Sequence, residues 1–207
     1  MIEQAVQAGW TFDQQFVGTS GQPVTGAGDV QFLAPNVVER VSTTESPQPN
    51  LAIIAMRQQQ LPVMCSFVVV ADRLSDPGNC GTIIRSAEAA GADAVVLTAG
   101  SVDPFNPKVV RASAGAIFRV PVVFAELDQL PGLIRIGTSS HHGLAYTQVD
   151  LRRNVALVMG NEAHGLDDSE RIDEWLTIPH AGATESLNVA MAATVLVFEV
   201  ARQRRAN

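Results

Sequence analysis

Residues 67–71 read Phe-Val-Val-Val-Ala, and the polar segment that follows them, residues 72–79, reads Asp-Arg-Leu-Ser-Asp-Pro-Gly-Asn. An uninterrupted apolar run of about five residues is typical of a strand that lies in a parallel sheet and is covered on both faces. The next segment, residues 80–90, carries apolar side chains at helical spacing, and Gly91 stands where a helix commonly ends. This stretch therefore predicts a buried strand, a loop and a helix in succession.

The same alternation of apolar runs and helical segments extends over the rest of the chain. Further strands are predicted over residues 94–98, 120–124, 133–137 and 155–159. Pro121 and Arg135 are less usual in a buried strand. The last segment, from Val189, has apolar residues at helical spacing and ends in three arginines, which suit the negative end of a helix dipole. Alternating strands and helices predict an α/β fold with a mainly parallel sheet.

The first 60 residues differ from the remainder in composition. They contain two stretches rich in turn-forming or polar residues, at 18–28 and 42–50. The elements expected here are a short helix and a short strand or helical turn, over residues 2–8 and 51–56. We expect two domains, residues 1–60 and residues 61–207.

The 207 residues are 46% hydrophobic and 17% charged, which is typical of a globular protein rather than a disordered chain. The longest apolar stretch, residues 189–198, is far shorter than the roughly 18 residues needed to cross a bilayer. The N-terminus has no basic segment followed by an apolar run, which argues against a secretory signal. We therefore expect a cytoplasmic protein without a membrane span, in which Cys65 and Cys80 are reduced.

The formal net charge of −7 argues against binding of nucleic acid through bulk electrostatics. It leaves room for a local basic groove. The 14 cationic residues are Lys108 and thirteen arginines, and arginine is the better residue for bidentate contacts with phosphate.

Three loops combine glycines with polar side chains, and each lies next to a predicted strand or helix. They cover residues 72–85, 160–166 and 178–188. Ligands of open parallel sheets bind beyond the carboxyl ends of the strands, and glycine lets the backbone approach a ligand closely. These loops are therefore the candidate binding site.

Some polar residues of these loops could instead have a purely structural role. Asn79, Ser186 and Asn188 are each suited to cap the start of a helix. The chain has neither a Gly-x-Gly-x-x-Gly sequence nor a Walker sequence, which removes the commonest dinucleotide and triphosphate motifs. His141 and His142 are adjacent and would point to opposite faces of a strand, so we expect no metal site. Ser186 has no His and Asp partners at motif spacing, which argues against a hydrolase triad.

Taken together and in this order, the three loops resemble the signature motifs of the SpoU/TrmH family of RNA ribose 2′-O-methyltransferases, within the SPOUT superfamily. The first motif resembles Asn79-x-Gly-x-Ile-x-Arg85, and the second resembles Met159-Gly160-Asn161-Glu162. The third is similar to the segment from Ile178-Pro179 to Ser186-Leu187-Asn188. The resemblance covers about residues 62–205.

This resemblance implies a fold, a cofactor and an assembly. The implied fold is an α/β sheet whose C-terminal part forms a trefoil knot, which general connection rules treat as exceptional. The implied cofactor is S-adenosylmethionine, and the implied assembly is a homodimer that acts on rRNA or tRNA. The residues that would contact the cofactor are Gly160, Ile178 and Leu187. Those that would form the catalytic surroundings are Asn79, Arg85, Glu162, Ser186 and Asn188.

Two features depart from the family pattern. His180 stands where the family commonly has Met. Residues 1–60 resemble a shortened form of the α/β domain with which many members hold RNA, yet their formal charge is −3, from five carboxylates against Arg40 and Arg57. The leading hypothesis is transfer of a methyl group to a ribose 2′-hydroxyl. The alternatives are a non-catalytic RNA-binding or assembly factor, and a small-molecule enzyme that uses another nucleotide.

Overall fold

The computed structural model describes residues 1–41, 47–161, 164–166, 171–182 and 186–205. Contacts between residues divide the chain into two compact units, Met1–Gln58 and Gln59–Asn207. Within the ranges described, no helix is both long enough and apolar enough to span a membrane.

The first unit contains a three-stranded sheet with the order β2-β1-β3. Its elements are α1 (Ile2–Gln7), β1 (Phe12–Val17), β2 (Asp29–Phe32), α2 (Val37–Val41) and β3 (Asn50–Ile54). Strand β1 pairs in parallel with β2 and antiparallel with β3. The buried carboxamide of Gln15 donates to the carbonyls of Val24 and Gly28 and accepts the N–H of Val24, so this polar group is satisfied inside the unit.

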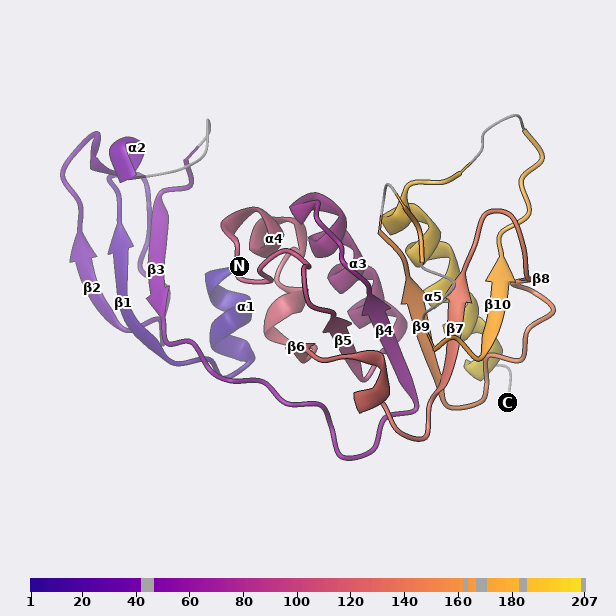
Figure 1. The fold of residues 1–207 in the computed structure, drawn as a ribbon. Helices are drawn as coiled ribbons and strands as arrows, with labels where there is room; N and C mark the ends of the chain where they lie inside the picture. The colour runs from indigo at the N-terminus through magenta and orange to yellow at the C-terminus, as the bar shows by residue number, and fades with distance from the viewer. Residues whose placement is uncertain (42–46, 162–163, 167–170, 183–185, 206–207) are drawn as a thin grey trace. The chain divides into compact units, whose positions relative to one another are not determined.

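The second unit is built on a seven-stranded sheet with the order β6-β5-β4-β9-β7-β10-β8, and all its neighbouring strands run parallel. The prediction of an α/β fold with a mainly parallel sheet is confirmed. The strands are β4 (Phe67–Ala71), β5 (Ala94–Leu97), β6 (Val122–Phe124), β7 (Ile134–Thr138), β8 (Leu144–Ala145), β9 (Val155–Met159) and β10 (Glu174–Thr177). Figure 1 shows β9 between β4 and β7, although it follows both in the chain.

The helices of the second unit are α3 (Pro77–Ala90), α4 (Pro107–Ala112) and α5 (Val189–Arg205), with short 3-10 turns η1 (Ala116–Phe118) and η2 (Leu127–Gln129). Helix α3 begins three residues before the predicted start. Its N-cap is Asp76, whose carboxylate accepts the N–H of Asn79 at 2.7 Å, and Pro77 occupies the first turn. The interpretation of Asn79 as the N-cap is therefore wrong. Gly91 ends the helix in a left-handed conformation, as expected.

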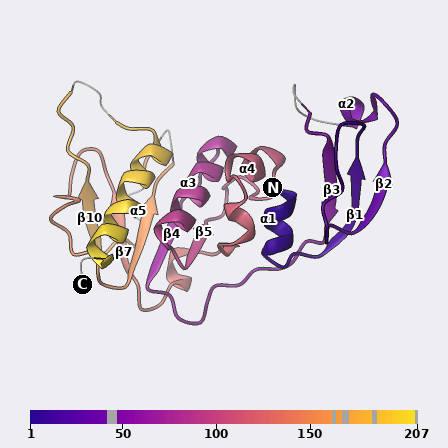
Figure 2. The same ribbon diagram turned by 180° about the vertical axis from the view of Figure 1, so that it is seen from behind.

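The two faces of the large sheet are covered differently. Figure 2 shows α3, α4 and α5 side by side on one face. On the other face, side chains of the central strands pack with residues of the loops and of η2. The buried members of that cluster are Val68, Val70, Ala94, Val96, Val123, Leu130, Leu133, Ala156 and Val158. Coverage on both faces explains why these strands read as apolar runs.

Helices α3 and α4 touch at the level of their backbones. A Cβ atom on Gly81 would lie 2.6 Å from the carbonyl oxygen of Val109 and 2.5 Å from the Cβ of Ala112. Real Cβ atoms do not approach other atoms so closely, so only glycine permits this helix spacing.

The C-terminal turn of α5 is fixed by Arg204. Its guanidinium donates to the hydroxyl and the carbonyl of Ser66 and to the carbonyls of Leu151 and Arg153, at distances from 2.7 to 3.2 Å. It also lies over the ring of Phe67 at 5.4 Å. Burial lowers the pKa of the Arg204 guanidinium from its usual value. These bonds join the last helix to the starts of β4 and β9.

Candidate functional site

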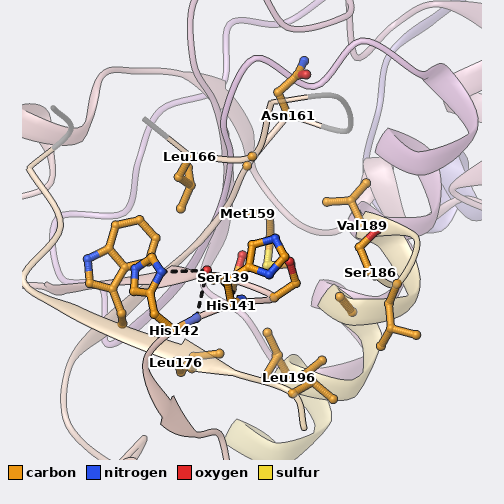
Figure 3. A pocket seen from close by; sticks show the side chains of 18 of the residues that line it. Ser139, His141, His142, Met159, Asn161, Leu166, Leu176, Ser186, Val189 and Leu196 are labelled. Carbon is orange, nitrogen blue, oxygen red and sulfur yellow. Dashed lines mark hydrogen bonds between the residues drawn. The ribbon is translucent and has the colours of Figure 1, made fainter. Parts of the chain in front are cut away.

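A pocket of about 660 Å³ opens at the carboxyl ends of β7, β9 and β10 and is closed on one side by the start of α5. Figure 3 shows Ser139, His141 and His142 on one side of it and Ser186 and Val189 on another. Its lining comprises Thr138–His142, Met159–Asn161, His164–Leu166, Trp175, Leu176, Ile178, His180, Ser186–Val189, Ala192 and Leu196. Its position is the one at which open parallel sheets bind ligands.

The part of the lining that the structure describes is apolar or polar without carboxylate, ammonium or guanidinium groups. Met159, Leu176 and Leu196 provide apolar surface. None of the described lining residues is Lys, Arg, Asp or Glu, while all four histidines of the chain are present. Phosphate groups are normally bound by arginine, by lysine or by a helix N-terminus with free N–H groups. The start of α5 lies in this pocket, but Asn188 already accepts the N–H groups of Ala190 and Met191 there. This lining therefore suits a nucleoside-sized ligand without a phosphate chain, and it disfavours the hypothesis of another nucleotide that carries one.

Two histidines give this pocket polar groups with defined surroundings. Nδ1 of His142 lies 3.0 Å from the hydroxyl of Ser139, and its ring lies 4.6 Å from the ring of Trp175. Nε2 of His180 is buried and has no hydrogen-bond partner among the residues that the structure describes. A buried polar atom without a partner is costly, so a ligand that supplies one is stabilised in this pocket.

The loop after β9 folds back tightly on itself. Asn161 and Gly165 exchange backbone hydrogen bonds of 2.9 and 3.1 Å. A Cβ atom on Gly160 would lie 2.4 Å from the carbonyl carbon of Gly165 and 2.5 Å from the nitrogen of Leu166. Gly160 is therefore required first by its own loop, and not only by the approach of a ligand as the sequence suggested.

Asn161 joins this loop to the end of β4. Its side-chain nitrogen donates to the carbonyl of Arg73 at 2.7 Å, and Arg73 has a positive φ of 48°. The buried carboxylate of Asp72 accepts hydrogen bonds from the Arg73 guanidinium at 2.8 Å and from the hydroxyl of Thr98 at 2.7 Å. Non-glycine residues with such a φ are uncommon and cluster at functional sites.

The starts of α3 and α5 meet through two asparagines. The side-chain nitrogen of Asn188 donates to the side-chain oxygen of Asn79 at 3.0 Å. The oxygen of Asn188 accepts the N–H groups of Ala190 and Met191, so the residue also caps α5. Further along both helices, the hydroxyl of Ser86 on α3 lies 2.8 Å from the hydroxyl of Thr194 on α5 and joins the same two helices.

The structure brings most of the predicted site residues together. Gly160, Ile178, Ser186, Leu187 and Asn188 line the pocket. Asn79 is joined to it through Asn188. Arg85 is exposed on α3 and is not among the lining residues. Glu162 lies outside the described residues.

Sequence reasoning missed one wall of the pocket, which residues 138–142 and Trp175 form. Residues 138–142 directly follow a predicted strand, so their position could have marked them as candidates. They were not selected because this loop holds no glycine before Gly143. Trp175 lies on β10, a strand that the sequence did not predict.

Residues 66–198 match the model of the SpoU rRNA methylase family. The chain belongs to this family. Among SpoU relatives, the 23S rRNA (guanosine(2553)-2′-O)-methyltransferase RlmP of Bacillus subtilis is 39% identical over 177 residues, which cover 82% of this chain and 71% of that protein. The 23S rRNA (uridine(2479)-2′-O)-methyltransferase of Streptomyces viridochromogenes is 34% identical, over 83% of this chain and 67% of that protein.

Two solved methyltransferase structures have the same fold. The SpoU methyltransferase AviRb of Streptomyces viridochromogenes, in complex with AdoMet, has a TM-score of 0.88 and 29% identity, and the match covers 100% of this chain and 88% of that one. The AdoMet-bound rRNA methyltransferase of Sinorhizobium meliloti has a TM-score of 0.85 and 30% identity, with coverage of 97% and 84%.

The loop geometry makes Gly160→Ala a destabilising change in this SpoU protein. The added methyl group must displace the backbone of Gly165 and Leu166, and overpacking of this kind costs about 1–3 kcal/mol. Chemical denaturation should show this loss of stability. Gly182→Ala is the control, because a Cβ there meets no atom of a described residue within 4 Å. Equal stability of the two variants would contradict the proposed packing.

Proposed function

We propose that this protein is a methyltransferase that uses S-adenosylmethionine to methylate a ribose 2′-hydroxyl of rRNA or tRNA. One observation carries the proposal. The loops of the second and third motifs line a single pocket, and a hydrogen bond joins this pocket to Asn79 of the first motif. The names of the relatives support it, since two of them are 23S rRNA 2′-O-methyltransferases.

The pocket fits S-adenosylmethionine in size and in chemistry. Its volume of about 660 Å³ lies within the usual range for such ligands. The absence of charged side chains from the described lining suits a nucleoside without phosphates, and the unpaired Nε2 of His180 offers it a hydrogen bond. We assign Gly160, Ile178 and Leu187 to the cofactor. When bound, the cofactor supplies a methyl group that is already activated on a sulfonium sulfur.

The protein's own residues have to align the ribose and manage the proton of its hydroxyl group. We propose that the Asn79–Asn188 pair, with Ser186, positions the ribose at the mouth of the pocket. We keep Glu162 among the catalytic surroundings because it follows Asn161 directly in the second motif.

We propose that Arg85 binds RNA phosphate beside the site and stabilises the charge that develops during transfer. Its side chain is exposed on α3, about two turns after Asn79, and makes no hydrogen bond or ion pair with any described residue. A guanidinium that has no partner in the protein is available for a bidentate contact with phosphate.

The position of β9 supports a knotted topology. We propose that the C-terminal part of the sheet forms a trefoil knot. Strand β9 lies between β4 and β7, and β10 and α5 follow it in the chain. Threading a chain end through an earlier loop produces an order of this kind.

We also propose that residues 1–60 are a shortened domain for RNA and that residues 61–207 are the methyltransferase domain. The small sheet of the first unit supports a separate domain. With a formal charge of −3, this domain contributes little through phosphate binding.

A homodimer is part of the proposal, and α5 supplies the surface. Met191, Val195 and Phe198 recur at spacings of four and three residues, so they share one helix face, and each is 40–66% exposed. Self-association through a two-fold axis would bury this face against its copy.

The decisive experiment is methyl transfer with labelled S-adenosylmethionine. With EDTA present, we expect the cofactor to bind in calorimetry, and we expect unmodified rRNA or tRNA to acquire label at a ribose 2′-oxygen. RNA from cells that lack the protein is the substrate. Binding of RNA without cofactor binding or label would support the alternative of a non-catalytic assembly factor.

Arg85→Ala should lower the single-turnover rate at least about a hundredfold, because one charge-stabilising donor is lost. Arg85→Lys should restore the rate only in part, since an ammonium cannot make the bidentate contact. Calorimetry should give wild-type cofactor affinity for both variants. Thr82→Ala, on the same exposed face of α3, is the control. A rate for Arg85→Ala within a few-fold of wild type would refute this role.

Phe198→Asp should convert the dimer into a monomer, because the apolar face of α5 would then bury a charge. Light scattering at micromolar concentration measures the mass. Phe124→Asp, at a phenylalanine on β6 that is 57% exposed against 45% for Phe198, should leave the dimer intact. A monomeric wild-type protein would overturn the assignment.

A further inference from the structure

Three cations of α3 and α4 differ from most other cations of the second unit, and among the described residues only Arg171 and Arg205 share their exposure and lack of a partner. Within the described ranges, the side chains of Arg85, Lys108 and Arg111 have no hydrogen-bond, ion-pair or ring partner, and all three are exposed. Most other arginines of this unit bind carboxylates or carbonyls of the protein itself. These are Arg73, Arg119, Arg135, Arg152, Arg153, Arg202 and Arg204.

The fold places the three cations on neighbouring surfaces. Lys108 and Arg111 are three residues apart on α4, so they lie on the same side of that helix. The backbone of α4 touches α3 at Gly81, and Arg85 follows Gly81 by about one turn. Figures 1 and 2 both show α4 next to α3.

From α4 to η1, the chain runs along α3 from the start of that helix toward its end. Arg119, just after η1, binds Glu88 near the end of α3, whereas residues 109–113 touch its beginning. Lys108 therefore lies toward the start of α3, at the edge of the sheet where the pocket opens. A ligand that reaches Arg85 from this side passes over α4.

The exposed face of α3 that carries Arg85 has mostly small side chains. Gly78, Thr82 and Ala89 share the exposed face with Arg85 and have small side chains. Glu88, three residues after Arg85 on α3, is bound by Arg119. The carboxylates of Asp76 and Asp103 each accept a backbone N–H of their own loop. An extended polyanion can approach such a surface, and its phosphates supply the partners that the protein does not.

We propose that the α3–α4 surface formed by Arg85, Lys108 and Arg111 binds the phosphate backbone of the substrate RNA and guides it to the pocket. The proposal rests on the proposed function and extends it, because it assigns RNA affinity to α4 rather than to the acidic first unit. Lys108 and Arg111 act through phosphate binding alone and touch neither cofactor nor reacting atoms.

The test is the double variant Lys108→Gln/Arg111→Gln, with filter binding of an unmodified 23S rRNA transcript between 25 and 200 mM KCl. Loss of two phosphate contacts should weaken binding at least about tenfold at 100 mM KCl. It should also reduce the slope of log affinity against log salt by about 1.4 to 1.8, since each contact releases counterions. The single-turnover rate at saturating RNA and the cofactor affinity should stay within about threefold of wild type.

Two matched variants separate charge at this surface from other effects. The exchange Lys108→Arg/Arg111→Lys keeps both charges and should therefore keep the salt slope of the wild type. Arg152→Gln/Arg205→Gln removes two exposed cations elsewhere and should leave the salt slope nearly unchanged.

The outcomes distinguish this proposal from the proposed function. If the wild type methylates RNA while the Gln double variant keeps its affinity and salt slope, the surface is not the RNA-binding surface. Failure of the wild-type protein to bind the transcript at 25 mM KCl would also overturn the proposal that the α3–α4 surface binds RNA. A wild type that binds RNA through this surface, but transfers no methyl group, overturns the proposed function alone.

Discussion

The backbone pairing of β9 is the constraint on which the rest of the second unit depends. Val155–Met159 are buried throughout, and they hydrogen-bond to β4 on one side and to β7 on the other. A buried strand must satisfy its backbone on both edges, because an unpaired N–H or C=O without water costs free energy. This requirement fixes where β9 ends. The turn at Gly160 therefore lies beside the loops that follow β4, β7 and β10, and a pocket results at their meeting point.

The sequence was most informative where burial is complete. Strands β4, β5 and β9 are covered on both faces, so their residues are apolar without interruption and could be recognised. Strand β10 could not, because Glu174-Trp175-Leu176-Thr177 is only half-buried and begins with a carboxylate that binds Arg153. Its place in the sheet is set by long-range pairing with β7, which no local pattern encodes.

The sequence allowed the loops of the site to be predicted, but not the contacts and distances between them. Five of the site residues predicted from these glycine-containing loops line the pocket, among them Gly160 and Asn188. The hydrogen bond between Asn79 and Asn188 joins residues that are 109 positions apart in the chain. The N-cap of α3 is Asp76 rather than Asn79, which the sequence did not indicate. Composition alone could not reveal that the described lining of the pocket holds no Lys, Arg, Asp or Glu while exposed cations lie on α3 and α4, since a net charge of −7 conceals this distribution.

Helix α5 is held to its surroundings at three points along its length of about 25 Å. Asn188 binds Asn79 at its start, Thr194 binds Ser86 near its middle, and Arg204 binds the starts of β4 and β9 at its end. A helix held in this way has little rotational or sliding freedom to lose. Because α5 supplies one wall of the pocket, that wall is preorganised, and binding of a ligand pays little conformational entropy there.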